Sequence, residues 1–162
     1  MSDSSAVISD CGIYRYSLYR KITEAEHPKI CLFIMLNPST ADALKDDPTI
    51  RKCKSYAQAW GYDALEVINV YAYRATKPSD LPDEDVKRTG PDYFAYADAA
   101  IQNADIVVCG WGRNVDEATS QFMLAYIVGQ GKSPYCLAIN KGGTPKHPLY
   151  LKKDLSPTPF SL

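Results

Sequence analysis

The most informative segment of this chain is Ile30-Cys-Leu-Phe-Ile-Met-Leu36 followed by Asn37-Pro-Ser-Thr-Ala-Asp-Ala-Leu-Lys-Asp-Asp-Pro-Thr-Ile-Arg51. The first part is an unbroken apolar run, which predicts a strand buried on both faces of a sheet. The second part is polar and leads into a helical pattern. Open α/β folds place their chemistry in such loops, at the carboxyl edge of a parallel sheet. We therefore expect an α/β fold with its functional site just after residue 36.

A helix is predicted to begin near the end of this stretch, with Asp47 as its N-cap and Pro48 at its first position. Its apolar residues recur at helical spacing, at Ile50, Cys53, Ala57 and Trp60. Gly61 is placed to end the helix. Asp46 and Asp47 could instead act together as a metal-binding or acid–base pair, but helix capping explains Asp47 more simply.

Strand and helix patterns alternate along the rest of the chain. Strands are predicted over residues 64–73, 105–112 and 134–140, and helices from Pro91 to Ile101 and from about Asp116 to Val128. The buried side of the second of these helices is expected to be formed by Ala118, Phe122, Ala125 and Tyr126. This alternation predicts a three-layer α/β/α fold, in which helices cover both faces of a central, mostly parallel sheet of four strands.

An additional N-terminal strand is predicted over residues 12–22, where bulky apolar and charged side chains alternate loosely. The pattern is typical of an edge strand with one solvated face. Its Arg15, Arg20 and Lys21 are able to contact phosphate, but charges on edge strands more often serve to keep the strand soluble.

Length and composition narrow the class of protein. A chain of 162 residues is expected to form a single domain, with a core from about residue 13 to 151 and with residues 1–11 and 152–162 loosely attached. The net charge of −1 provides no long-range attraction to nucleic acid or to anionic membranes, so a polyanion would have to meet a local basic patch. The start of the chain lacks the pattern of a signal peptide, and no run approaches the ~20 apolar residues of a membrane span. We expect a cytoplasmic protein without a membrane partner.

The five cysteines are scattered, mostly within apolar runs, and no Cys-x-x-Cys pair occurs. They are expected to be reduced core residues. Because His27 and His147 are the only histidines, a structural zinc site is not expected either. The sequence predicts no metal and no cofactor.

Candidate site residues follow the four strands, in segments 37–40, 73–76, 110–112 and 141–147. A parallel sheet gathers such segments at one edge. Asn37 either forms a rigid turn or contacts a ligand. Asn69, within a buried strand, needs hydrogen-bond partners and is either a structural tie or a reader of a ligand. Trp111 and Tyr150 could stack on a base or simply pack. Ser39 has neither a histidine placed to activate it nor a Gly-x-Ser-x-Gly elbow, which argues against a serine hydrolase.

The sequence resembles, over about residues 14–151, a bacterial and phage family catalogued only as a domain of unknown function. The resemblance rests on Tyr14-Arg-Tyr-Ser-Leu18, Met35-Leu-Asn-Pro-Ser-Thr-Ala-Asp42, Asp46-Asp-Pro-Thr49, Asn69-Val-Tyr-Ala-Tyr-Arg-Ala-Thr76, Gly90-Pro91, Trp111-Gly112 and His147-Pro-Leu-Tyr-Leu151. The family implies no activity.

A more distant resemblance is to the uracil-DNA glycosylase superfamily. It rests on the order of Leu36-Asn-Pro38, Ile68-Asn-Val70, an apolar third strand that ends in glycine, and His147-Pro148. The resemblance implies a fold of that type, with Asn37 holding the hydrolytic water, Asn69 reading the edge of the base and His147 stabilising the departing base. Breaking an N-glycosidic bond leaves negative charge on the base, so a donor at a base oxygen and a placed water suit the chemistry.

We expect from these patterns a domain that binds a nucleobase, a nucleotide or nucleic acid, with N-glycosidic-bond hydrolysis as the chemistry to test. The alternatives are a non-catalytic module for a nucleotide or modified base, and a protein-interaction domain. The candidate catalytic residues are Asn37 and His147. The candidate substrate-binding residues are Ser39, Thr40, Asn69, Tyr71, Arg74, Trp111, Lys141, Lys146 and Tyr150.

Overall fold

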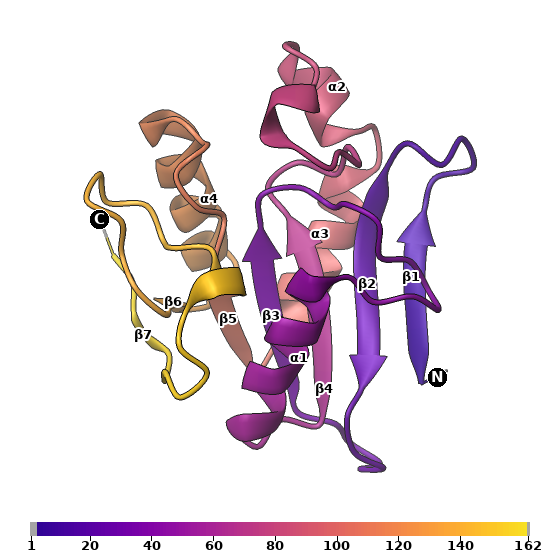
Figure 1. The fold of residues 1–162 in the computed structure, drawn as a ribbon, viewed down its shortest axis with the longest axis vertical. Coiled ribbons are helices and arrows are strands. Elements are labelled where there is room, and N and C mark those ends of the chain that lie inside the picture. The colour runs from indigo at the N-terminus through magenta and orange to yellow at the C-terminus, as the bar shows by residue number, and fades with distance from the viewer. Residues whose placement is uncertain (1–2, 162) are drawn as a thin grey trace.

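Residues 3–161, which the computed structural model describes, form a mixed α/β fold with one seven-stranded sheet and four α-helices (Figure 1). The strands are β1 (Ser4–Ile8), β2 (Arg15–Lys21), β3 (Ile30–Met35), β4 (Ala64–Asn69), β5 (Ile106–Cys109), β6 (Pro134–Cys136) and β7 (Thr158–Pro159). The α-helices are α1 (Pro48–Ala59), α2 (Asp85–Thr89), α3 (Tyr93–Asn103) and α4 (Glu117–Gly129). Two short 3-10 helices, η1 (Pro78–Asp80) and η2 (Pro148–Tyr150), lie in loops.

The sheet runs in the order β1-β2-β4-β3-β5-β6-β7. Its centre consists of the four parallel strands β4, β3, β5 and β6, whereas β1, β2 and β7 are antiparallel to their neighbours. The expectation of four strands and one edge strand was therefore wrong in number, because the described part of the sheet has seven. β1 and the two-residue β7 are too short to produce a periodic pattern that a sequence reading can recognise.

Both terminal segments contribute to the sheet. Residues 4–8, expected to be loosely attached, form β1 and pair with β2. Near the other end, β7 pairs with β6, and the Phe160 side chain is 2% exposed and packs edge-on against Trp111. β2 is consequently an inner strand and not the edge strand that its charges indicated.

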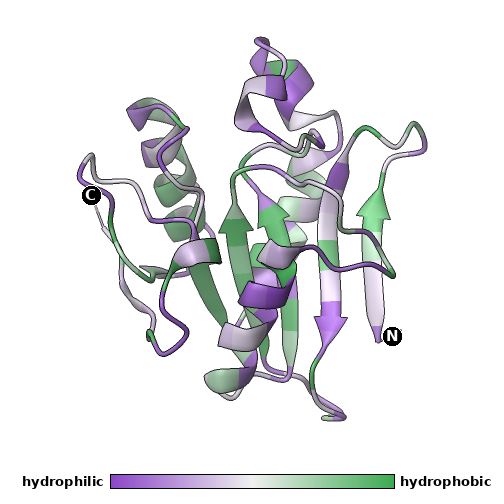
Figure 2. Ribbon diagram, in the orientation of Figure 1, coloured by the Kyte–Doolittle hydropathy of each residue, from purple (hydrophilic) through white to green (hydrophobic). Residues whose placement is uncertain are grey.

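Helices cover both faces of the central sheet, and the side chains of β3 alternate between two hydrophobic cores. One core lies beneath α1 and contains Cys31, Phe33 and Met35 of β3. The other lies beneath α3 and α4 and contains Leu32 and Ile34, with Leu36 just beyond the strand. Residues 31–36 are all buried, as the continuous apolar run predicted, and Figure 2 shows the central strands as the most hydrophobic part of the ribbon.

The start and end of α1 follow the predicted signals. The Asp47 side chain accepts a hydrogen bond from the Ile50 backbone N–H at 2.9 Å, and Pro48 occupies the first turn. Gly61, with a φ of 84°, follows the helix in the left-handed conformation that glycine tolerates best.

The buried side of α4 was predicted wrongly. Its buried residues are Ser120, Met123, Leu124 and Ile127, whereas Phe122 is 53% exposed. The apolar residues of α4 are distributed around the whole circumference of the helix, so their spacing does not identify the buried face. A tertiary hydrogen bond from Trp111 Nε1 to Ser120 Oγ, 3.1 Å long, is made on the side that faces the sheet. None of the helices in residues 3–161 is long and apolar enough to cross a membrane.

Candidate functional site

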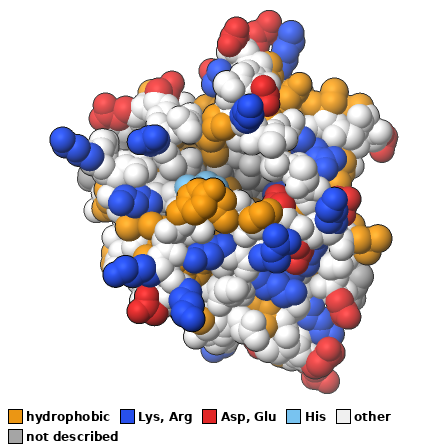
Figure 3. Space-filling model, viewed as in Figure 1, with side chains coloured by type: hydrophobic (Ala, Val, Ile, Leu, Met, Phe, Trp, Pro, Cys, Tyr) orange, Lys and Arg blue, Asp and Glu red, His pale blue; other side chains and the backbone are white. Residues whose placement is uncertain are grey.

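A cleft of about 810 Å³ opens where the parallel strands end at their carboxyl edge. Its walls come from segments that follow β3, β4, β5 and β6 and from the start of α1; the lining includes Leu36 to Thr40, Asp47 to Thr49, Ala75 to Pro78, Trp111 to Asn114 and Lys146 to Leu151, with some positions in these ranges set back. Figure 3 shows this face hollowed near its centre, with hydrophobic and basic side chains around the hollow. The polar loops of the sequence therefore meet at one place, as a parallel sheet requires.

A smaller cavity of about 40 Å³ adjoins the cleft and forms its floor. Asn37, Asn69 and His147 all line it, together with Arg15 and Asp47. The volume has room for a water molecule or for one oxygen-bearing group of a larger ligand, and its walls supply the polar partners that such a group needs. Asn69 at the end of β4, Asn37 just after β3 and His147 in the segment between β6 and η2 thus line a single cavity.

Asn37 fastens two loops together. Its Nδ2 donates to the backbone oxygen of Ala75 at 2.7 Å and to that of Pro38 at 3.1 Å. The Ala75 N–H in turn donates to the Pro38 oxygen at 2.8 Å, so the loops after β3 and β4 are held side by side. With Nδ2 engaged in this way, the amide oxygen Oδ1 remains the group of Asn37 that is able to accept from a water or ligand. Asn37 is therefore placed for both roles, turn and ligand contact.

Asn69 is 3% exposed and lies at the carboxyl end of β4. Its Oδ1 accepts a long hydrogen bond from Arg15 Nη2, at 3.5 Å. This contact orients the amide so that Oδ1 faces the arginine and the NH₂ group is left as a donor.

Arg15, which we expected to be a surface charge, is a buried member of the site. It is 2% exposed, and its Nη1 donates to the backbone oxygen of Ala41 at 3.2 Å. Within the described residues, its Nε is a buried donor without a partner. Burial lowers the pKa of the guanidinium to about 10, an effect that the nearby Asp47 carboxylate opposes, so the group keeps its charge at neutral pH.

A β-bulge in β2 explains why Arg15 points to the floor of the cleft. Ser17 pairs with Val7, but Arg15 pairs with Ile8, so Tyr16 is an extra residue on this strand. The extra residue shifts the alternation of side chains by one position and brings Arg15 to the face of Leu18, beneath α1. The sequence indicated Arg15 only as a charged residue of a loosely alternating strand that could contact phosphate, and that pattern does not reveal a bulge.

His147 stands at the mouth of the cleft and is exposed there, while also lining the small cavity. Its Nδ1 accepts a hydrogen bond from the Leu149 N–H at 3.2 Å, which caps η2. In the neutral ring the proton is therefore on Nε2. The walls of the cleft lower the pKa of His147 by partial desolvation, and the Asp47 carboxylate opposes this shift. The ring is consequently a neutral Nε2–H donor at physiological pH.

Asp47 links these groups electrostatically. One carboxylate oxygen caps α1, as predicted, and the residue is 9% exposed. Its charge acts on both Arg15 and His147, raising the pKa of each relative to burial alone. Sequence reasoning recognised the cap but did not place Asp47 at the site.

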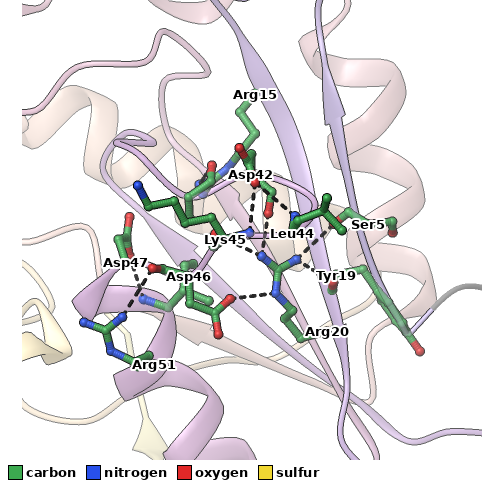
Figure 4. A network of polar contacts seen from close by, with 12 residues as sticks. Ser5, Arg15, Tyr19, Arg20, Asp42, Leu44, Lys45, Asp46, Asp47 and Arg51 are labelled. Atoms are coloured by element: carbon green, nitrogen blue, oxygen red, sulfur yellow. Dashed lines mark hydrogen bonds and ion pairs between the residues drawn. The ribbon is translucent and has the colours of Figure 1, made fainter.

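Arg20 holds the loop between β3 and α1 in place, as Figure 4 shows. This arginine is 4% exposed; its Nε pairs with Asp46 Oδ1 at 2.7 Å, and its Nη2 donates to the backbone oxygens of Asp42 at 2.5 Å and Lys45 at 3.2 Å. The interpretation of Arg15 and Arg20 as solubilising charges on an edge strand was wrong, because β1 and this loop cover them.

The cleft also contains other candidates from the sequence, namely Ser39, Thr40, Lys146 and Tyr150. Tyr150 is 93% exposed and projects from the rim. Trp111 borders the cleft but is 1% exposed, and its Nε1 is engaged with Ser120, so it packs in the core and offers no stacking surface. The lining also includes residues that the sequence did not single out, among them Thr49, Arg113 and Asn140.

Tyr71, Arg74 and Lys141 are not brought to this cleft. Tyr71 is buried in the core beneath α3, with the Arg88 guanidinium 5.3 Å from its ring centre. Arg74 donates to the backbone oxygens of Ser39 and Gly12 and lines a neighbouring cleft of about 500 Å³. Lys141 lines another neighbouring cleft of about 370 Å³.

No group of three or more His, Cys, Asp or Glu residues is placed to hold a metal ion in the described part of the chain. Of the five cysteines, Cys31, Cys53, Cys109 and Cys136 are buried, and all five are free thiols. The polar side chains that line the small cavity are the amides of Asn37 and Asn69, the hydroxyls of Ser39 and Thr49, the imidazole of His147, the carboxylate of Asp47 and the guanidinium of Arg15.

Comparison with known proteins gives one match. A family model described as "Protein of unknown function (DUF1643)" matches residues 15–149. No curated protein and no solved structure matches the chain.

Proposed function

The chain belongs to the DUF1643 family, and because that family's description states no activity, we propose a function from the site: the cleft binds a nucleobase, as part of a nucleotide or nucleic acid, and hydrolyses its N-glycosidic bond. The observation that carries the proposal is the convergence of Asn37, Asn69 and His147 on one cavity of about 40 Å³. Docking to another protein would not require these three side chains, which come from separate segments of the chain, to meet in one small cavity.

The groups on the floor match the needs of this reaction. A departing base develops negative charge, which the Nε2–H of a neutral His147 stabilises by donating to a base oxygen. The Asn69 NH₂, oriented by Arg15, donates to the base edge. Asn37 Oδ1 orients a water for attack at the sugar carbon. The order of Asn37-Pro38, Asn69 and His147-Pro148 along the chain resembles the order of motifs in the uracil-DNA glycosylase superfamily. The proposal therefore includes a fold of that type together with these three roles.

Base release tests the proposal. Uracil-containing and modified-base oligonucleotides, and free nucleosides, are incubated with the protein, and released base is measured by chromatography. We expect release from at least one substrate and a loss of about a hundredfold or more with His147→Asn. Asparagine is a good N-cap, so this variant keeps the acceptor for the Leu149 N–H and removes only the imidazole. No release from any substrate, or unchanged release with His147→Asn, would remove the catalytic part of the proposal.

A second candidate, a non-catalytic module that captures a nucleotide or modified base, is favoured by one observation. An amide is a poor general base, and the single carboxylate that lines the small cavity, within the described residues, is already engaged in capping α1. Tight binding of a nucleotide without turnover would select this candidate. Mass spectrometry of small molecules retained by the purified protein would name the base in either case.

A further inference from the structure

The charges of this chain are strongly segregated, although its net charge is −1. Residues 48–60 and 141–153 together contain seven basic residues and no acidic one. Since the whole chain has 18 basic and 19 acidic residues, the remainder has 11 basic and 19 acidic residues, a net charge of −8. The basic residues of the two segments are Arg51, Lys52, Lys54, Lys141, Lys146, Lys152 and Lys153.

The two basic segments lie against each other in the structure. Lys52 Nζ donates to the backbone oxygen of Leu151 at 2.6 Å, and the Tyr56 hydroxyl donates to that of Lys152. Both segments also form walls of the cleft, through Pro48 and Thr49 on one side and residues 146–151 on the other. Figure 1 shows the yellow turn of η2 beside α1, and Figure 3 shows Lys and Arg side chains around and below the hollow. We call this surface, residues 48–60 with residues 141–153, the basic rim.

The charges of the basic rim are available to a ligand. Arg51, Lys141, Lys146, Lys152 and Lys153 are exposed, whereas Lys52 is held by Leu151. The acidic residues that immediately precede α1 do not offset them at the surface. Asp46 is paired with the buried Arg20, and Asp47 caps the helix.

An exposed aromatic side chain accompanies these charges. Tyr150 is 93% exposed at the mouth of the cleft, within the segment that carries Lys146 and Lys152. A basic groove with an aromatic side chain on which a base can stack is the usual arrangement for binding single-stranded nucleic acid. Phosphate contacts account for most of the affinity in such complexes, and stacking tolerates any base.

We infer that the ligand of the cleft is a single-stranded polynucleotide, whose phosphates lie along the basic rim while one base enters the cleft and a neighbouring base stacks on Tyr150. This inference rests on the proposed base-binding function and adds that the base arrives on a strand. A single strand presents its bases without the cost of unpairing a duplex. The net charge of −8 outside the rim repels a polyanion elsewhere, so binding is confined to this surface and duplex wrapping is disfavoured.

The salt dependence of binding tests the inference. Affinities for single-stranded DNA and RNA oligonucleotides, the matching duplex and nucleoside monophosphates are measured by fluorescence anisotropy or calorimetry between about 50 and 200 mM salt. Lys152→Ala with Lys153→Ala is expected to reduce the slope of log affinity against log salt by about 1.4, since each phosphate contact to a single strand contributes roughly 0.7. Tyr150→Ala is expected to weaken single-strand binding roughly tenfold without changing this slope.

A charge-matched control is Lys21→Ala with Lys29→Ala, at the opposite edge of the sheet, which should leave affinity and slope unchanged. Equal effects of the two double variants, or equally tight duplex binding, would overturn the inference. If nucleoside monophosphates bind but oligonucleotides bind no more tightly, the inference fails and the proposed function stands. If neither binds, both fail. Binding to anionic lipid vesicles in place of oligonucleotides would assign the basic rim to membranes and would also overturn the inference.

Discussion

Arg15 illustrates how a single residue shapes the site. The buried guanidinium orients Asn69 and ties the loop after β3 to β2 through the Ala41 backbone oxygen. Its charge remains uncompensated by a direct ion pair in the described residues, and its Nε has no protein partner there. Burying an N–H donor without a hydrogen-bond partner costs free energy, which an acceptor on a water or ligand would offset. The Arg15 Nε therefore indicates that the floor of the cleft is a place for an acceptor group.

Replacing Arg15 tests this role. We expect Arg15→Met to lower the free energy of unfolding by about 1–3 kcal/mol, because the Ala41 and Asn69 oxygens lose a buried donor, with relief of the desolvated charge as a partial offset. Base binding should weaken as well, since the Asn69 amide is then free to flip. Urea unfolding and calorimetry measure the two effects. Arg51→Met, at an exposed position, is the control and should change stability by less than about 0.5 kcal/mol. An Arg15→Met protein with wild-type stability and affinity would contradict the role of Arg15 in supporting the loop after β3 and orienting Asn69.

Glu66, in β4, makes stability depend on pH. Burial raises the pKa of its carboxyl from 4.5 to about 7. Between these values the unfolded chain has released a proton that the folded protein retains, so the free energy of unfolding should fall as pH rises from about 4.5 to about 7 and then level off. The slope cannot exceed about 1.4 kcal/mol per pH unit for one group. Urea unfolding across this range should show a smaller fall for Glu66→Gln than for the wild type; identical pH profiles would exclude the effect.

At the level of elements, the loop between β3 and α1 holds site residues in position and also carries the Asp47 charge that acts on His147. Arg20 fixes the middle of the loop from β2, and Asp47 ends it by starting α1. Asn37 fixes its beginning to the loop after β4. The loop is therefore attached at three points, which hold Asn37 and Asp47 in place beside the cleft.

Two substitutions of Asp47 separate these roles. Asp47→Ala removes the cap and should cost about 1 kcal/mol of stability, whereas Asp47→Asn keeps a good cap and should cost less. Both remove the charge that raises the pKa of His147, so the imidazole should titrate at lower pH in both variants. Denaturant unfolding and NMR titration of the imidazole provide the measurements. If the titration of His147 is unchanged in Asp47→Asn, the electrostatic link between the two residues is wrong.

In the molecule as a whole, the faces of the sheet form the hydrophobic cores, whereas its carboxyl edge carries the candidate site. Two hydrophobic cores, one beneath α1 and one beneath α3 and α4, bury both faces of β3. The carboxyl edge of the parallel strands carries the cleft, and the basic rim lies beside it because α1 and the segment after β6 pack together. The net charge of the chain is near zero, but the basic rim is locally positive and suited to a polyanion. Measuring how binding depends on salt distinguishes attraction at the basic rim from the absence of attraction that the net charge alone would predict.

Features that depend on neighbouring residues could be predicted from the sequence. The buried β3, the cap and first turn of α1 at Asp47 and Pro48, and the glycine after that helix were all predicted, because each is specified by a local pattern. The order of polar loops along a parallel sheet also predicted that the loops after β3, β4, β5 and β6 would meet at one edge, where they line the cleft.

Other features of the site and of the sheet depend on contacts between distant segments and are seen only in the folded chain. Arg15 reaches the floor because a bulge at Tyr16 shifts the alternation of β2, and no local pattern shows such a shift. Tyr71 and Trp111 are directed into the core by the packing of α3 and α4, although their sequence positions are adjacent to polar loops. β1 and β7 exist through pairing with distant strands. Strand register and through-space burial are properties of contacts between segments far apart in the chain, which is why sequence periodicity alone does not contain them.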